Sequence, residues 1–244
     1  MTKAILTGHS RGLGSAIAAA LLQRGIPTLG LARRANAELG QAHRDLLIQV
    51  EIDLGDDAAL ADWLDGSSLR HFLKDAGTIL LINNAGIVQP VGPSETQAPA
   101  AIAQAVRLNV AAPLMLFAAA AAARGKAELR AAHISSGAGR KAYAGWNVYC
   151  ATKAALDHHA RAVVEDKGHG IRICSLAPGV IDTEMQAEIR GSAAEKFPLL
   201  ADFVAMKRDG ALAKPADTAA KIVHYLLSDP FGREPVADIR QVSI

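Results

Sequence analysis

The feature that most constrains the fold of this chain is a regular alternation between short aliphatic segments and longer helical stretches. The short segments are rich in Ile, Val and Leu, which is typical of strands buried on both faces of a sheet. They predict strands at Ala4–Thr7, Thr28–Leu31, Leu46–Ile52, Thr78–Asn83, Ala131–Ser135 and Ile171–Leu176. Helices are predicted at Leu13–Arg24, Asp57–Asp75, Pro99–Arg124, Val148–Lys167 and Pro215–Leu227. Because strands that alternate with helices pair in parallel, we predict an α/β fold, a Rossmann-type doubly wound parallel sheet with helices on both faces.

The chain is predicted to form a single domain over residues 1–244. Its residues are 50% hydrophobic, which is enough for one well-buried core. No linker rich in Pro, Gly or Ser divides it. Residues 184–210 are less regular and contain Met185, Phe197 and Phe203. This mixture fits a lid over an apolar substrate within the domain, although a peripheral pair of helices fits it equally well.

Charge and composition argue against several other classes of protein. The net charge is only +2 and no run of Lys and Arg exceeds a pair, so nucleic-acid binding is not expected. The first residues lead into a predicted strand without the apolar run of a secretory signal, and no apolar stretch approaches a membrane span without interruption. We therefore expect a cytoplasmic protein with no membrane partner. Cys150 and Cys174 lie far apart, and the adjacent His158 and His159 point in different directions on a helix, so no metal site is expected.

A glycine-rich turn follows the first predicted strand, with the sequence Thr7-Gly8-His9-Ser10-Arg11-Gly12-Leu13-Gly14. Glycine lets the backbone turn sharply and approach a phosphate without a Cβ clash. The helix that begins here adds free N–H groups and a positive partial charge. The turn therefore predicts a site for the pyrophosphate of a dinucleotide, although its spacing is G-x-x-x-G-x-G rather than G-x-G-x-x-G.

The end of the second predicted strand indicates which dinucleotide is bound. Binders of unphosphorylated NAD usually place an acid there, about 20 residues beyond the glycine turn, to bind the ribose hydroxyls. This chain instead has Ala32-Arg33-Arg34 and no acid. Arg33, with Arg11 from the glycine turn, suits a 2′-phosphate because guanidinium presents a fork of donors. The pattern predicts NADP(H), although two surface arginines at a strand end would look the same.

Tyr149 and Lys153 stand four residues apart, so a helix would place the phenol and the ammonium on one face. A phenol is a poor base near neutral pH, because its unperturbed pKa is about 10. An adjacent cation favours the phenolate and lowers that pKa. The pair predicts a tuned general acid/base, although many helices carry such a spacing by chance as a solvated pair.

Taken together, these motifs resemble the classical short-chain dehydrogenase/reductase family over nearly the full length. Further matches are Asp53-Leu54, the run Asn83-Asn84-Ala85-Gly86, Asn109 within Leu-Asn-Val, Ser136 thirteen residues before Tyr149, and Pro178-Gly179-x-x-x-Thr183. The resemblance implies that the catalytic residues are Asn109, Ser136, Tyr149 and Lys153. It implies that the cofactor-binding residues are Gly8, Ser10, Arg11, Gly12, Leu13, Gly14, Arg33, Asp53, Leu54, Asn83, Ala85, Gly86, Tyr149, Lys153, Pro178, Gly179, Val180 and Thr183. His9 departs from the small residue that is usual in the family's turn.

A narrower resemblance is to the sepiapterin reductase and benzil reductase branch of that family. It rests on Gly145-Trp146-x-x-Tyr149-Cys150, on Asp182-Thr183-x-Met185, and on a tail that lacks the Gly-Gly common in the family. Trp146 and Met185 are then candidates for the substrate pocket. A carboxylate near the C-terminus holds the pterin in sepiapterin reductase, and Asp238 is the matching residue, although a plain surface acid is as good an interpretation.

The function implied by the resemblance is NADPH-dependent reduction of a ketone, either a vicinal dicarbonyl or a pterin side-chain ketone. Tyr149 would donate a proton to the substrate oxygen, and Ser136 would hydrogen-bond that oxygen. Lys153 would lower the phenol pKa and bind the nicotinamide ribose, and Asn109 would hold a water that relays protons. Alternatives are an NADP-dependent alcohol dehydrogenase, a 3-oxoacyl-type reductase and, more remotely, a non-catalytic cofactor sensor. The resemblance also implies a small-molecule carbonyl substrate and a homodimer or homotetramer.

Overall fold

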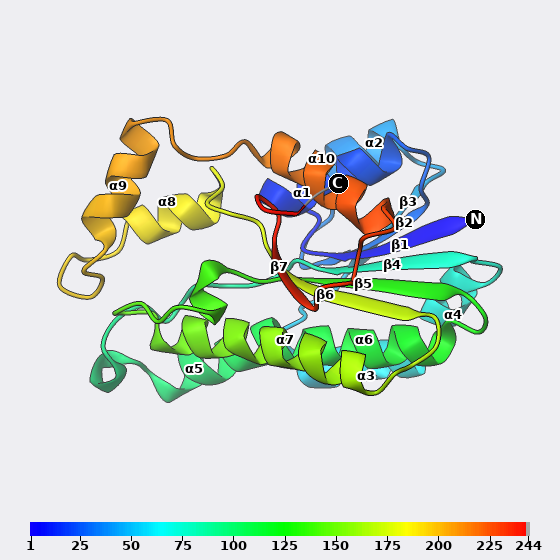
Figure 1. Cartoon of the computed structure of the whole chain (residues 1–244), viewed down its shortest axis with the longest axis horizontal. Coiled ribbons are helices and arrows are strands. Elements are labelled where there is room, and N and C mark those ends of the chain that lie inside the picture. The colour runs from blue at the N-terminus through cyan, green and yellow to red at the C-terminus, as the bar shows by residue number, and fades with distance from the viewer. Residues whose placement is uncertain (243–244) are drawn as a thin grey trace.

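The structure, a computed structural model that describes residues 1–242, is a single-domain α/β fold around a seven-stranded parallel sheet (Figure 1). The strand order is β3-β2-β1-β4-β5-β6-β7. The strands are β1 Thr2–Thr7, β2 Thr28–Ala32, β3 Leu47–Glu51, β4 Thr78–Asn83, β5 Glu128–Ile134, β6 Ile171–Ala177 and β7 Val236–Asp238. The predicted doubly wound sheet is confirmed, with β7 added at its edge beside β6.

Helices cover both faces of the sheet, and each layer closes its own apolar core (Figure 1). On one face lie α1 Gly12–Leu22 and α10 Pro215–Leu227, whose Ile17 and Ile222 pack with Leu6 of β1. The short α2 spans Ala37–Ala42. The opposite layer contains α3 Asp57–Asp65, α4 Ser68–Leu73, α5 Pro99–Val106, α6 Ala112–Ala123 and α7 Asn147–Glu165. Because β1, β2 and β4 are apolar and buried toward both layers, the sheet forms the centre of the molecule.

Two predicted helices are interrupted. The helix expected over residues 57–75 is two helices, because Gly66 is extended and ends the first. The stretch expected over residues 99–124 contains a π-helical turn at Arg107–Ala111. The expectation that no apolar stretch approaches the length of a membrane span was wrong, since the helical stretch Pro99–Ala123 is long and apolar enough to cross a membrane by length and composition alone. However, a core helix passes the same test, and Leu116 and Phe117 of this helix are buried against the sheet.

Residues 184–210 contain α8 Glu184–Arg190 and α9 Leu200–Arg208, which lie beyond the carboxyl ends of the strands (Figure 1). They pack on the start of α7 through a third apolar cluster. Phe197, in the connection between the two helices, is 0% exposed and contacts Trp146 in this cluster. The segment is therefore a helix pair that shares a largely aromatic cluster with the start of α7.

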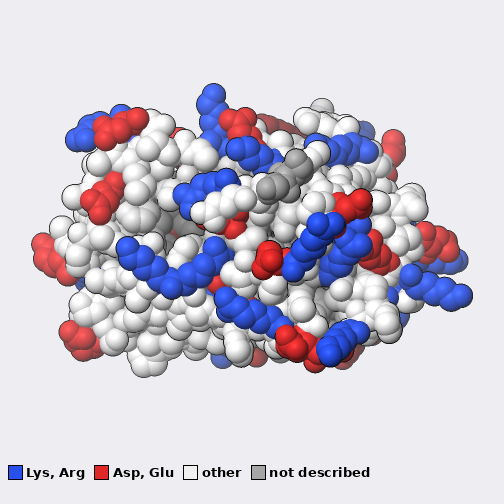
Figure 2. Space-filling model, viewed as in Figure 1, with Lys and Arg blue, Asp and Glu red and all other residues white. Residues whose placement is uncertain are grey.

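Charged side chains of both signs are interspersed on the face shown in Figure 2. Most ion pairs within residues 1–242 have carboxylates at least partly open to solvent. Asp157 is the most buried of these carboxylates, since its side chain is 1% exposed where it pairs with Arg140 at 3.3 Å, compared with 9% for Asp238 beside Arg240. A buried carboxylate requires hydrogen-bond partners, and it stands out among the charges of this structure.

Candidate functional site

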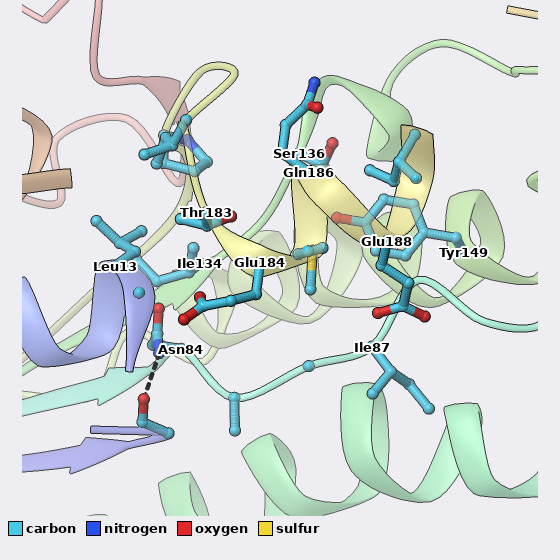
Figure 3. A pocket seen from close by; sticks show the side chains of 18 of the residues that line it. Leu13, Asn84, Ile87, Ile134, Ser136, Tyr149, Thr183, Glu184, Gln186 and Glu188 are labelled. Atoms are coloured by element: carbon cyan, nitrogen blue, oxygen red, sulfur yellow. Dashed lines mark hydrogen bonds between the residues drawn. The ribbon is translucent and has the colours of Figure 1, made fainter. Parts of the chain in front are cut away.

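A large cleft of about 1110 Å³ opens at the carboxyl edge of the sheet, where doubly wound folds bind ligands. Its walls come from the turn between β1 and α1, the ends of β2, β4, β5 and β6, the start of α7, and α8 and α9. Figure 3 shows part of this cleft, with Leu13 and Asn84 at one end and Ser136 and Tyr149 toward the other. The cleft is large enough for a dinucleotide together with a small substrate.

The glycine turn forms the floor of one end of the cleft. Gly8 and Gly12 have positive φ values of 69° and 56°, which L side chains rarely adopt. A Cβ on Gly14 would lie 2.0 Å from the carbonyl oxygen of Gly8, so no side chain fits there. No side chain caps the N-terminus of α1. Its free N–H groups and the bare backbone therefore fit the pyrophosphate of a dinucleotide.

Asn84, rather than the expected Asn83, holds this turn. The Asn84 amide donates to the carbonyl oxygens of Thr7 at 3.0 Å and Gly8 at 3.3 Å, and the side chain lines the cleft. Asn83 is 2% exposed, donates to the carbonyl of Pro113 and bonds to His133 Nδ1. Since successive strand residues face opposite sides, the Asn83 side chain points away from the cleft.

His9 fits into the glycine turn because β2 has no side chain opposite it. The His9 ring is fully buried, and a Cβ on Gly30 would lie 2.6 Å from it. Its Nε2 bonds to Gln49 Oε1 at 2.8 Å. Burial is the largest effect on the His9 imidazole and lowers its pKa, although the Gln49 bond opposes this shift. The unusual residue in the turn is thus accommodated by Gly30.

Three arginines line the end of the cleft that lies beside the end of β2. Arg11, Arg33 and Arg34 all line it and are exposed. None of them forms an ion pair within the part of the chain that the structure describes. Asp53 also lines the cleft, and its Oδ1 accepts from the N–H of Gly55 at 2.9 Å. The three cations give this end of the cleft a positive surface suited to an anionic group.

Ser136, Tyr149 and Lys153 meet at the inner wall of the cleft. Tyr149 and Lys153 lie in the first turns of α7 and are 8% and 5% exposed, while Ser136 follows β5. The Lys153 ammonium donates to the carbonyl of Ile134 at 2.8 Å and lies 5.6 Å from the centre of the Tyr149 ring. Figure 3 shows Ser136 and Tyr149 directed into the same part of the cleft. The predicted trio is therefore assembled in space.

The pKa of Tyr149 shifts in the direction opposite to the sequence-based expectation. Burial of the phenol raises its pKa to about 12, and a hydrogen bond from Ser136 opposes that rise only in part. Lys153 is engaged with the carbonyl of Ile134 rather than with the phenol. Desolvation is therefore the largest effect on the Tyr149 phenol, which is protonated at neutral pH.

Burial also lowers the pKa of Lys153, to about 8, and the negative charge of Asp157 opposes this shift. Asp157 lies one helical turn further along α7. Lys153 is thus poised to lose its proton at mildly alkaline pH, which an exposed lysine would not do.

Asn109 supports the site without lining the cleft. It lies in the π-helical turn and is 1% exposed. Its Oδ1 accepts from the N–H of Ile87 at 2.9 Å, and its Nδ2 donates to the Ile87 carbonyl at 2.8 Å and to Thr152 at 3.2 Å. A Cβ on Gly86 would lie 3.2 Å from Asn109 and 3.6 Å from the Lys153 ammonium. Asn109 therefore fixes the 86–87 segment directly beside Lys153.

Aromatic rings build the wall of the cleft beyond Tyr149. Trp146 lines the cleft and stacks on Phe197, with ring centres 4.7 Å apart and an interplanar angle of 20°. The Trp146 indole also meets Tyr149 at 5.4 Å and Phe203 at 5.3 Å, edge to face. Met185 packs against the same cluster and lines the cleft. Trp146 and Met185 thus both line the cleft, and their contact with the substrate stays a prediction.

Helix α8 adds two acids that the sequence-based prediction missed. Glu184 and Glu188 are one turn apart, and both project into the cleft (Figure 3). A Cβ on Gly12 would lie 3.3 Å from Glu184 Oε2, so this carboxylate reaches toward the glycine turn. Glu188 lies on the Tyr149 side (Figure 3). Their i, i+4 spacing was visible in the sequence, but which face of α8 covers the cleft was not.

Asp238 does not line the cleft, in contrast to the expected substrate contact. Both of its oxygens are held by the guanidinium of Arg240, at 2.9 Å and 2.6 Å. These hydrogen bonds are the largest cause of its lowered pKa. Arg240 itself lines the cleft beside Gly179, where a Cβ would lie 3.3 Å from its Cδ. The tail thus presents a cation, not a free carboxylate, to the cleft.

Known proteins resemble this chain over most of its length. The family model for short chain dehydrogenases matches residues 2–194. A benzil reductase ((S)-benzoin forming) of Bacillus cereus is 35% identical over 249 residues, which covers 98% of this chain and 99% of that protein. The sepiapterin reductase of Mus musculus is 31% identical over 244 residues, covering 93% of this chain and 92% of that protein.

A solved short-chain dehydrogenase/reductase from Burkholderia vietnamiensis is 47% identical, with a TM-score of 0.73, and the match covers 99% of this chain and 98% of that one. These relatives confirm the predicted resemblance to the benzil and sepiapterin reductase branch. The glycine turn and the cleft fit the nicotinamide cofactor on which such oxidoreductases depend. This chain belongs to the short-chain dehydrogenase family.

Proposed function

We propose that this protein is an NADPH-dependent carbonyl reductase in which Tyr149 is the general acid. The observation that carries the proposal is the meeting of the Ser136 hydroxyl, the Tyr149 phenol and the Lys153 ammonium at the inner wall of the cleft. Reduction of a ketone needs such a proton donor, because the substrate oxygen gains negative charge as hydride arrives. The bound nicotinamide supplies that hydride, and the protein supplies position and polarity.

Each neighbouring residue has a defined task in this proposal. The Ser136 hydroxyl donates a hydrogen bond to the substrate oxygen and so orients the carbonyl toward Tyr149. The Lys153 ammonium adds positive charge beside the phenol that is losing its proton. Asn109 keeps the 86–87 segment, which borders Lys153, in place.

The preference for NADPH over NADH rests on the exposed arginines. Arg11, Arg33 and Arg34 face the cleft at the end of β2. Their charges are unpaired within residues 1–242 and would bind a 2′-phosphate. The end of β2 offers no acid that would repel that phosphate.

The substrate class follows from the other half of the cleft. Its aromatic wall suits flat, partly aromatic ketones such as diaryl diketones or pterin side-chain ketones. The charged residues that also line the cleft are of both signs and include Glu188, Asp202, Lys141 and Arg240. The aromatic wall is the feature that favours a vicinal dicarbonyl or pterin substrate over a 3-oxoacyl thioester. A cytoplasmic location and a homodimer or homotetramer complete the proposal.

Oxidation of NADPH and NADH should be followed at 340 nm against benzil, sepiapterin, quinones, simple aldehydes and a 3-oxoacyl thioester. We expect turnover with the diketone or the pterin, and a higher kcat/KM with NADPH than with NADH. Turnover confined to the thioester would refute the substrate class. No turnover of any carbonyl with either cofactor, in a protein that binds NADPH, would refute the reductase itself.

A further inference from the structure

The most buried carboxylate of the ion pairs in residues 1–242 lies directly beneath the catalytic residues, and the mechanism above leaves it without a task. Asp157 is 1% exposed on α7. Its Oδ1 accepts hydrogen bonds from the hydroxyls of Ser135 and Ser175, both at 2.7 Å. Its Oδ2 pairs with Arg140 Nε at 3.3 Å. One buried carboxylate thus joins α7 to the ends of β5 and β6 and to the loop after β5.

Two of these contacts bracket the catalytic serine. Ser135 immediately precedes Ser136, and Arg140 follows the 3-10 turn Gly137–Gly139 that Ser136 begins. That turn lies close against α7, since a Cβ on Gly139 would be 2.9 Å from Asp157 Oδ2. The position of Ser136 relative to Tyr149 is therefore set on both sides by the same carboxylate.

The charge of Asp157 acts on Lys153 as well, one helical turn away. None of the other titratable groups that face Lys153 supplies a negative charge in place of Asp157. Tyr149 is protonated at neutral pH because burial raises its pKa to about 12. His133 on β5 is neutral, because burial, His159 and Lys153 together lower its pKa to about 3. Arg140 is a cation already paired with Asp157. Asp157 thus supplies the negative charge that opposes the loss of the proton from Lys153.

We propose that Asp157 is a positioning residue for carbonyl reduction: it holds the loop that carries Ser136 and keeps a negative charge one turn from Lys153. The inference rests on the proposed function, because it assigns Asp157 to the same proton-donating site. It predicts two separable effects, one on geometry through Ser135 and one on charge through Lys153.

A matched pair of serine variants tests the geometric effect. Ser135 and Ser175 are both buried and donate to the same oxygen at the same distance, but only Ser135 adjoins Ser136. Ser135→Ala should lower kcat by about tenfold and Ser175→Ala by no more than about twofold, because small displacements of a reacting group are costly. Equal losses in kcat, with equal losses in thermal midpoint, would show that Asp157 only stabilises the fold.

Asp157→Asn tests the charge effect, because it keeps the shape and removes the charge. Lys153 should then lose its proton more readily, and the alkaline limb of the kcat/KM profile should move to lower pH by about one unit. Arg140→Gln removes the opposite charge and should leave that limb in place or move it to higher pH. A limb that does not move in Asp157→Asn, or that moves in the same direction in both variants, would overturn the inference.

The unliganded protein gives a readout that needs no substrate. The pKa of folded Lys153, about 8, lies below its ordinary value of 10.5, so the unfolded chain binds more protons between these limits. Stability therefore rises as the pH increases through this window. In Asp157→Asn the rise in thermal midpoint should begin at lower pH than in the wild type, and coincident curves would refute the charge effect. This stability measurement tests the role of Asp157 even if no carbonyl is turned over. Absence of turnover would contradict the proposed function and not the effect of Asp157 on Lys153. If Asp157→Asn does not fold, the serine pair decides.

Discussion

The two ends of the cleft recognise ligands by different means. At the cofactor end, backbone contacts control the shape, and a Cβ on Gly14 would lie 2.0 Å from a carbonyl oxygen. At the substrate end, aromatic side chains from the start of α7, from α9 and from the connection between α8 and α9 pack around Trp146. A surface made of backbone has almost no freedom to vary, whereas one made of side chains can change with each substitution. Cofactor binding is therefore shared across such a fold, whereas substrate choice is local to the chain.

The largest expected effect is at the boundary between the two ends. Tyr149→Phe should lower kcat by about 10² to 10⁴, since it removes the positioned proton donor. Binding of NADPH, measured by fluorescence titration, should remain nearly unchanged because the ring is retained. A variant with wild-type turnover on a confirmed substrate would remove Tyr149 from the mechanism. A Tyr149→Phe variant that no longer binds NADPH would show that the phenol belongs to the cofactor end of the cleft as well as to the substrate end.

The next effect belongs to the cofactor end. Gly14→Ala forces a Cβ against Gly8 and Asn84, at 2.0 Å and 2.6 Å. We expect a destabilisation of about 1–3 kcal/mol and an affinity for NADPH and NADH that falls about 100-fold. Gly25→Ala is the control, because Gly25 has a φ of 69° but no atom within 4 Å of its Cβ position. It should lose stability through backbone strain while both cofactors bind normally. Similar cofactor affinities in the two variants would argue against the close approach at Gly14.

A smaller and more selective effect is expected at the same end. Arg33→Asp should lower the affinity for NADPH by about 10- to 100-fold, the value of one or two hydrogen bonds between charged groups. The affinity for NADH should change much less. The control is Arg44→Asp, because Arg44 is exposed and does not line the cleft, and this substitution makes the same change in net charge. Michaelis constants for both cofactors in the two variants test the assignment, and a parallel loss for NADPH and NADH in Arg33→Asp would contradict it.

The smallest effect concerns the substrate end alone. Glu188→Gln should improve the reduction of a ketone that carries a carboxylate, relative to its amide, by about fivefold, the scale of one exposed charge interaction. Cofactor affinity should not change. The control Glu195→Gln removes an exposed acid that does not line the cleft, and it should leave this ratio unaltered. A ratio that shifts equally in both variants would reduce the role of Glu188 to one of net charge.

The main strands and the motifs around them could be predicted because their determinants are local. Periodicity located all six predicted strands, helical spacing paired Tyr149 with Lys153, and the family resemblance added Ser136 to the same site. The edge strand β7 was not predicted, because three residues carry no pattern and its strand character comes from pairing with β6. The division of residues 57–75 into two helices was missed, although Gly66 was visible as a helix terminator.

The misplaced site residues share a physical cause, since each depends on what lies across space. Asn83 and Asn84 are adjacent, and only the position of β4 in the sheet decides which of them reaches the glycine turn. Asp238 was matched as a substrate contact, but Arg240 turns back and neutralises it. The acids of α8 were visible, while the face of that helix that meets the cleft was not.

The parallel α/β architecture, the glycine turn and the Tyr149–Lys153 pair could be predicted because they follow from local propensity and spacing, whereas Asn109 and Ser136 were assigned by resemblance to a family. The electrostatics of these residues depend on the packing of the whole fold. Spacing predicted a lowered pKa for Tyr149, yet burial of the phenol raises that pKa to about 12. Likewise, only the fold brings Ser135, Ser175 and Arg140 together on the Asp157 carboxylate. Desolvation and charge pairing of a group depend on every element that packs around it. A local sequence pattern does not show which elements those are.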